Sequence, residues 1–241
     1  QFQLNEETVW GGSPYNNTNP KAKDALPRIR QLIFEGKNKE AQELCGPTIC
    51  SPSANGMPYQ TVGSLHLDFD GISNYNDYYR DLDIAKAIAT TRFTANGVTY
   101  TREAYTSFPD QVLVIRLTAS QKKSISFTAK YTTPYKSNVV RSISSRKELQ
   151  LSGKANDHEG IEGKVEFTAL TRIENSGGSL EATSDSTLQV KNANSVTLYV
   201  SIGTNFVNYK DVSGNALSTA QKYLKQVNKN YAKNKAAHIN A

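Results

Sequence analysis

The β class of this chain is decided by residues 92–103, which read Arg92-Phe93-Thr94-Ala95-Asn96-Gly97-Val98-Thr99-Tyr100-Thr101-Arg102-Glu103. Two runs of β-forming residues flank an Asn-Gly pair, the strongest short-range signal for a β-hairpin. Alternating apolar and polar residues recur at 65–69, 125–131 and 196–202, with Gly and Asn turns between the runs. The sequence therefore predicts a mainly β protein built as one large antiparallel β-sandwich.

Residues 112–117, Val-Leu-Val-Ile-Arg-Leu, contain too few polar side chains for one face to meet water. This pattern predicts a central strand that is buried on both sides. The chain has 241 residues, enough for one good-sized β domain. Its apolar runs stay well short of the ~20 residues that cross a bilayer, so we expect no membrane span.

Helices are expected in two places. Asp24 can cap a first helix that Gly36 ends, and Asn38 begins a second helix that runs to Glu43. The apolar stripe of the first helix consists of Leu26, Ile29, Leu32 and Ile33. These patterns predict a helical insertion at about residues 21–45 of a β domain that spans residues 1–215.

A last helix is expected at residues 216–241, capped by Ser218. Its apolar stripe consists of Ala220, Tyr223, Leu224, Val227 and Tyr231. Five lysines between residues 222 and 235 account for much of the net charge of +6. Lysines at helical spacing are typical of a solvated face, and the other charges alternate in sign, so we expect no nucleic-acid partner.

Cys45 and Cys50 bracket four residues, a spacing that fits neither a redox motif nor a zinc knuckle. Two alternatives remain open, a disulfide that closes this short loop or two unpaired cysteines beside a helix end. The polar turn at Asn156–Gly160 holds His158 without a second ligand cluster to complete a metal site.

Carboxylate pairs are the candidates for glycosidase chemistry, which needs two such groups across a sugar. Glu6 and Glu7 are adjacent, and in a strand they would point to opposite faces. Asp68 and Asp70 would share a face but are more simply solubilising charges. His66, in an alternating strand, is interpreted as a wall residue and not as a catalytic base.

The N-terminal stretch Leu4-Asn5-Glu6-Glu7-Thr8-Val9-Trp10-Gly11-Gly12 resembles the opening of glycoside hydrolase family 95, the α-L-fucosidases with some α-L-galactosidases. Four further segments are similar to this family in the right order, and they lie at residues 57–65, 79–89, 100–112 and 204–211. The first of these four segments contains Tyr59 and Gln60. The resemblance covers nearly the whole chain.

The resemblance implies a galactose-mutarotase-like supersandwich followed by a linker helix, with catalysis in a helical-toroid domain that this chain lacks. No catalytic residue, metal or cofactor is then expected here, and the chain reads as a piece of a larger protein. The implied reaction of the parent is the inverting hydrolysis of a terminal α-L-fucosyl linkage on a glycan. The expected partner is the toroid domain, and the implied location is exported, periplasmic or at the surface of a bacterium.

The residues expected near substrate or at the domain interface are Asn5, Glu6, Trp10, Tyr59 and Gln60, since an aromatic ring and amides near Gly turns suit sugar binding. The alternative interpretation places Trp10 in the core and makes Glu6 a structural hydrogen-bond partner. A second hypothesis, an independent carbohydrate-binding module, would need coplanar exposed aromatic rings, for which Tyr75, Tyr78 and Tyr79 are candidates. The third hypothesis is a basic nucleic-acid binder.

Overall fold

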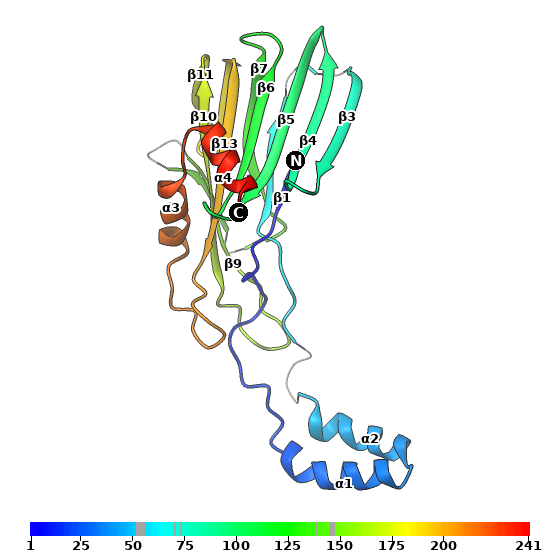
Figure 1. Ribbon diagram of the computed structural model, residues 1–241. Helices are drawn as coiled ribbons and strands as arrows, with labels where there is room; N and C mark the ends of the chain where they lie inside the picture. Colours follow the sequence, from blue (N-terminus) through cyan, green and yellow to red (C-terminus); the bar gives the residue numbers. More distant parts are fainter. Residues whose placement is uncertain (52–55, 70, 73, 138, 145–147) are drawn as a thin grey trace.

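Two antiparallel sheets face each other in the computed structural model, which describes residues 1–51, 56–69, 71–72, 74–137, 139–144 and 148–241 (Figure 1). The five-stranded sheet has the order β1 (Phe2–Leu4), β2 (Gly63–Asp68), β7 (Ile125–Thr132), β12 (Thr187–Ala193), β11 (Ser179–Ser184). The eight-stranded sheet has the order β3 (Asn76–Asp83), β4 (Ile88–Ala95), β5 (Val98–Ser107), β6 (Val112–Ala119), β13 (Ser195–Thr204), β10 (Glu166–Ser176), β9 (Leu149–Lys154), β8 (Val139–Ile143). The predicted mainly β sandwich is confirmed.

The hairpin predicted at residues 92–103 is formed by β4 and β5, in register from Ala89 opposite Ala104 to Ala95 opposite Val98. Asn96 and Gly97 connect the strands with φ angles of 51° and 73°. Positive φ at both central residues is the geometry of a type I′ turn, which matches the twist of the flanking strands. The turn residues therefore fix the register of this part of the sheet.

The main core lies between the two sheets. Side chains from β2, β7 and β12 meet those from β6, β9, β10 and β13, and Leu65, Phe127, Ile115, Phe167 and Leu198 are all almost fully buried. Along β7 the burial alternates residue by residue, because the inward face packs on the larger sheet and the outward face meets water.

Strand β6 is central, as predicted, and its two faces serve different clusters. Ile115 and Leu117 point into the core between the sheets, whereas Val112 and Val114 belong to a second cluster on the outer face of the large sheet. That outer cluster is completed by Ala220 and other side chains of the C-terminal helix α3 (Ala216–Gln226). A covering helix on one side and a sheet on the other explain why the strand is apolar throughout.

The C-terminal helical region differs from the prediction of one helix at residues 216–241. It consists of α3 (Ala216–Gln226) and α4 (Tyr231–Ile239). Asn215, and not Ser218, caps α3, since its side-chain oxygen accepts a hydrogen bond from the Ser218 N–H at 2.8 Å. Asn230 caps α4 in the same way through Lys233 N–H. The predicted stripe is nevertheless the packed side, with Ala220 and Leu224 buried.

The helical insertion comprises α1 (Ala22–Phe34) and α2 (Asn38–Ile49), which lie beyond one end of the sandwich (Figure 1). Two predicted bounds are wrong. Lys21, and not Asp24, occupies the cap position before α1. Asp24 lies inside the first turn, where its carboxylate interacts favourably with the helix dipole. Helix α2 runs past Glu43 to Ile49. Gly36 ends the first helix as predicted, with φ of 74° and with the Lys37 N–H bonded to the Leu32 carbonyl.

Candidate functional site

The predicted site residues lie on two neighbouring segments, residues 5–12 after β1 and residues 57–60 before β2. The Gly11 N–H donates to the Pro58 carbonyl, and the Gln60 N–H donates to the Val9 carbonyl, each at 2.9 Å. Between these bonds Trp10 and Tyr59 form an isolated β-bridge. The structure thus brings together two of the segments that sequence reasoning singled out.

Trp10 and Tyr59 form an exposed aromatic pair. Their ring centroids lie 5.3 Å apart at an interplanar angle of 66°, and the side chains are 44% and 46% exposed. The indole N–H donates to the Glu7 carbonyl at 2.7 Å, which fixes the ring against its own loop. The alternative that placed Trp10 in the core is therefore wrong.

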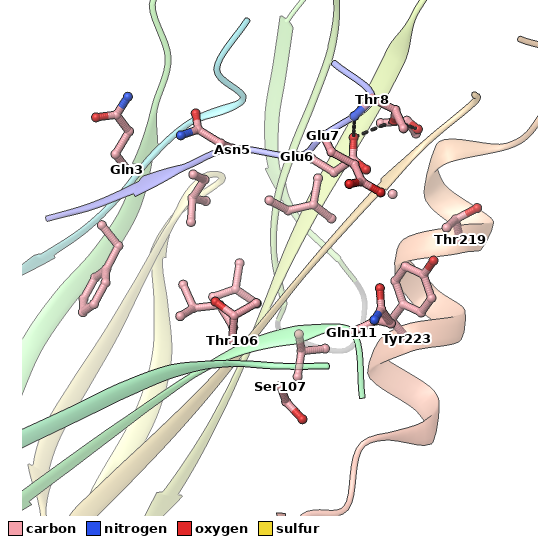
Figure 2. Close-up of a pocket in the computed structure, with 18 of the residues that line it drawn as sticks. Gln3, Asn5, Glu6, Glu7, Thr8, Thr106, Ser107, Gln111, Thr219 and Tyr223 are labelled. Carbon is pink, nitrogen blue, oxygen red and sulfur yellow. Dashed lines mark hydrogen bonds between the residues drawn. The ribbon is translucent and has the colours of Figure 1, made fainter. Parts of the chain in front are cut away.

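Glu6 is held by its neighbour two residues on. One oxygen of its carboxylate accepts hydrogen bonds from the Thr8 N–H at 2.8 Å and from the Thr8 hydroxyl at 2.6 Å (Figure 2). The Thr8 hydroxyl also lies 2.6 Å from that of Thr204 at the end of β13. Burial raises the pKa of Glu6, and this effect outweighs the opposing hydrogen bonds from Thr8. Glu6 therefore stabilises the N-terminal loop, which agrees with the alternative interpretation of Glu6 as a structural hydrogen-bond partner.

The expectation that Glu6 and Glu7 point away from one another is wrong. Strand β1 ends at Leu4 and residues 7–8 form a turn, so the alternation of a strand does not apply to them. Both glutamates line one cleft (Figure 2).

This cleft of about 920 Å³ opens between β1 with its following loop, the adjoining ends of β5 and β6, the end of β13, and α3. Asn5, Thr106, Gln111 and Tyr223 supply polar groups to its lining (Figure 2). Amides, hydroxyls and carboxylates are the groups that pair with sugar hydroxyls or with polar backbone. Asn5 is exposed on this lining, whereas Trp10 and Tyr59 lie outside it.

Gln60 connects three loops. Its side-chain oxygen accepts hydrogen bonds from the Tyr135 hydroxyl at 3.2 Å and from the Asn156 N–H at 3.0 Å. Burial raises the pKa of Tyr135 to about 12, so its hydroxyl stays a donor. Tyr59 also has a raised pKa, first through burial and then through the charges of Glu6 and Glu7. Gln60 thus stabilises the segment that presents Tyr59.

Sequence reasoning missed several partners of this site. Thr8 and Thr204 lie inside segments that resemble the family, but nothing in those segments marks the two as partners, and Tyr135 lies outside them. Phe206 lines the same cleft, and Val207 and Tyr209 follow it on an exposed loop. These residues belong to the segment 204–211, which resembles the family. That resemblance is the sequence signal that could have identified them.

The other candidate residues lie apart. The His66 ring nitrogen lies 2.9 Å from the Thr132 hydroxyl on the neighbouring strand, which fits a wall residue. Asp68 forms an exposed ion pair with Lys130 at 2.8 Å, and Asp70 lies outside the described residues. The His158 ring nitrogen Nε2 lies 3.9 Å from the carboxylate oxygen Oε1 of Glu159. In the described part of the chain, no three His, Cys, Asp or Glu side chains gather as a metal site would require.

Cys45 and Cys50 are free cysteines at the end of α2, with the Cys50 N–H bonded to the Cys45 carbonyl. Of the two alternatives, the structure contains the unpaired one.

The Tyr75 and Tyr78 rings, proposed as part of a sugar-binding platform, are 5.7 Å apart but tilted by 51°. They do not form the coplanar surface that an independent binding module was expected to show. Among the described residues, no helix is long and apolar enough to span a membrane.

Comparison with known families places the chain. Residues 1–209 match the family described as glycosyl hydrolase family 65, N-terminal domain. The chain belongs to this family. Recognition of a glycoside hydrolase N-terminal domain is thereby confirmed, although the matching family carries the number 65 where the motifs resembled family 95.

Curated relatives of this glycosyl hydrolase N-terminal domain are named as fucosidases. Alpha-L-fucosidase 2 of Arabidopsis thaliana is 29% identical over 231 residues, which cover 85% of this chain and 26% of that protein. Probable alpha-fucosidase A of Aspergillus oryzae is 24% identical over 216 residues (86% and 28%), and that of Aspergillus niger is 31% identical over 124 residues (48% and 15%). The chain therefore spans well under a third of the length of these relatives.

Among solved structures, a putative kojibiose phosphorylase from the human microbiome is similar with a TM-score of 0.46 and 13% identity. The similarity covers 76% of this chain and 28% of that one.

Proposed function

We propose that this chain is the non-catalytic N-terminal scaffold of an α-L-fucosidase-type glycoside hydrolase. The observation that carries the proposal is the similarity to alpha-L-fucosidase 2, which extends over 85% of this chain and only 26% of that protein. A segment of that extent in a family of N-terminal domains leaves most of the enzyme to other domains. The expected partner is a helical-toroid domain that carries the catalytic carboxylates.

The state of the acidic side chains supports a structural role. Glu6 accepts from Thr8, Glu103 from Lys235 and Tyr231, and Glu148 pairs with Arg172. A general acid or base needs a carboxyl that is free to meet the substrate proton. Carboxylates committed to such contacts serve the fold of this domain.

The exposed pair Trp10 and Tyr59 and the exposed loop at Val207 and Tyr209 support a further part of the proposal. Large apolar side chains in water mark interaction surfaces when they gather in one region. We assign to this region a contact with the catalytic domain, where Asn5, Trp10 and Tyr59 would form part of the wall near the substrate. Glu6 and Gln60 would hold that wall in shape.

The reaction proposed for the whole enzyme is hydrolysis of a terminal α-L-fucosyl linkage with inversion at the sugar carbon. An inverting enzyme places a water between its acid and base, and so the first product has the opposite anomeric configuration. An exported or cell-surface location goes with this proposal, because fucosylated glycans lie outside the cell.

The test is to express the gene that encodes this chain and to follow an α-1,2-fucosylated oligosaccharide by proton NMR. The proposal expects fucose to appear first as the β-anomer, and the matching α-L-galactoside shows whether galactosyl linkages are also cleaved. Absence of fucose release, or the α-anomer as the first product, would contradict it. Tight binding of the oligosaccharide by the 241-residue chain alone would favour a carbohydrate-binding module instead.

A further inference from the structure

The helices α1 and α2 form an arm, defined here as residues 22–49, that projects beyond one end of the sandwich (Figure 1). The two helices pack against each other, and within the described chain neither makes a comparable contact with a strand. Asn19 closes the base of the arm, since its side-chain amide donates to the carbonyls of Pro47 and Cys50. The arm is thus a separate helical hairpin that joins the sandwich through a narrow base.

The core of this arm is small. It consists of Ile29, Leu32 and Ala41, with partial cover from Ala25, Leu44 and Cys45. Two helices of 13 and 12 residues are marginal in water without tertiary packing, because ordering each residue costs more than propensity returns. Three buried side chains offset little of that cost.

Only half of the predicted apolar stripe of α1 is buried. Ile29 and Leu32 are buried, but Leu26 is 41% exposed and Ile33 is 51% exposed. Phe34, the last residue of the helix, is 87% exposed. Leu26, Ile33 and Phe34 stand at positions i, i+7 and i+8 and therefore share one side of the helix. This side, called here the α1 outer face, lacks a covering layer within the described chain.

The surroundings of the arm point to its partner. The segments that lead into and out of the arm are those that carry Trp10 and Tyr59, so the arm is joined along the chain to the proposed domain contact. The family is one of N-terminal domains, and the alpha-L-fucosidase 2 relative has most of its length outside the matched segment. A large domain of the same protein is therefore the occupant that this face fits.

Resting on the proposed function, we propose that the arm clasps the catalytic domain of the same enzyme and docks on it through Leu26, Ile33 and Phe34. The arm and the Trp10–Tyr59 pair then hold that domain from two points. Docking supplies the burial that the two helices lack by themselves.

Hydrogen exchange followed by mass spectrometry tests this directly, because backbone amides report local opening. In the 241-residue chain alone, amides of α1 and α2 should exchange far faster than those of β13. In the whole gene product the same arm amides should exchange at least about tenfold more slowly, with β13 as the internal reference. Equal exchange of the arm in both proteins would overturn the proposal.

A matched pair of variants in the whole gene product locates the contact. Phe34→Ser should return the arm to the fast exchange of the isolated chain. Ile84→Ser is the control, since Ile84 is also 87% exposed but lies in the turn between β3 and β4. Loss of arm protection in both variants, or in neither, would contradict docking through the α1 outer face.

Other occupants give other results. Protection of the arm that grows with the concentration of the 241-residue chain would assign the face to a second copy and overturn the proposal. The proposed function is scored separately by fucose release. Fucose release together with fast hydrogen exchange in the arm would contradict only the arm proposal. Slow exchange in the arm without fucose release would contradict only the proposed reaction.

Discussion

At the residue scale, the domain depends on a few buried polar contacts that no motif reveals. Arg172 on β10 donates through Nε and Nη2 to one oxygen of Glu148, each at 2.8 Å. Its remaining amino group donates to the Leu224 carbonyl at the end of α3. One guanidinium thus neutralises a buried carboxylate and satisfies a helix terminus that would otherwise lack a partner.

Removing this guanidinium should therefore be costly. Arg172→Met leaves the Glu148 carboxylate buried without its counter-charge, and the free energy of unfolding should fall by about 3 to 5 kcal/mol. Lys130→Met is the matched control, because it removes an exposed pair with Asp68 and should cost about 0 to 1 kcal/mol. Urea unfolding of both variants checks the difference, and equal losses would contradict this account.

Residue identity predicted some contacts of the site and not others. Trp10 and Tyr59 were both among the residues expected near substrate or at the domain interface, and the structure brings their rings into contact. The opposed directions expected for Glu6 and Glu7 were wrong, because β1 ends earlier than a local pattern can show. Register and strand ends depend on distant partners such as Gly63 opposite Leu4, which a local pattern does not contain.

At the element scale, α3 sits on the sheet because a glycine allows it. A Cβ at Gly203 on β13 would clash with the Ala216 carbonyl oxygen and would lie 2.6 Å from the Ala220 nitrogen. Both atoms belong to the backbone of α3, so the helix would have to move away. Close approach of helix and strand is thus built into this position.

Gly203→Ala should consequently lower the free energy of unfolding by about 1 to 3 kcal/mol through overpacking. Gly46 in α2 offers a contrast, since a Cβ there meets no atom within 4 Å outside its own helix backbone and its two chain neighbours. Gly46→Ala should change the free energy of unfolding by less than about 1 kcal/mol, because the Pro47 ring disfavours a helical residue with a Cβ before it and so opposes the gain in helix propensity. Circular dichroism and thermal unfolding check both, and a neutral Gly203→Ala would show that α3 is not held this closely.

Helix α4 is attached through polar contacts. Asn234 is buried, accepts from the Tyr105 hydroxyl at 2.7 Å and donates to Asp110 at 2.8 Å. Glu103 accepts from Tyr231 and Lys235. Burial raises the pKa of Glu103, but hydrogen bonds and charge from Lys235 together with the Tyr231 hydroxyl outweigh it, so the pKa is lowered.

The lowered pKa sets the pH dependence of this attachment. A carboxyl with a lowered folded pKa stabilises the fold above its unfolded pKa of about 4.3, and the gain is lost as pH falls through the folded value. Glu103→Gln should thus be less stable than the parent chain at pH 7, and the difference in stability between the two should be smaller at pH 3. Thermal unfolding at the two pH values tests this, and a gap that is constant with pH would argue against a role for the carboxylate charge.

The predicted elements show where sequence patterns suffice. The hairpin at residues 92–103 and the double-faced strand β6 followed from local residues, because turn chemistry and two-sided burial leave marks in sequence. The C-terminal stripe was read correctly, yet the helix breaks near Val227. The break lets α3 pack on β10 and β13 while α4 crosses to β5, an arrangement set by the sheet and not by propensity.

At the scale of the whole molecule, a closed sandwich core coexists with surfaces that face outward. The core between the sheets is dense with buried Leu, Ile, Val and Phe, and the outer cluster under α3 is equally well covered. The cleft along Glu6 and Glu7, the Trp10–Tyr59 pair and the arm face solvent. Such a division suits the scaffold proposed above, which would contact another domain through its exposed surfaces.

The most direct test is a fucose-release assay on the 241-residue chain alone, with an α-1,2-fucosylated oligosaccharide and with folding verified by cooperative thermal unfolding. The account predicts a folded chain that releases no fucose. Turnover by the folded chain would contradict the scaffold role and direct attention to Glu6 and Glu7 in the cleft. Loss of that turnover in a Glu6→Gln, Glu7→Gln double variant would then place catalysis in this domain.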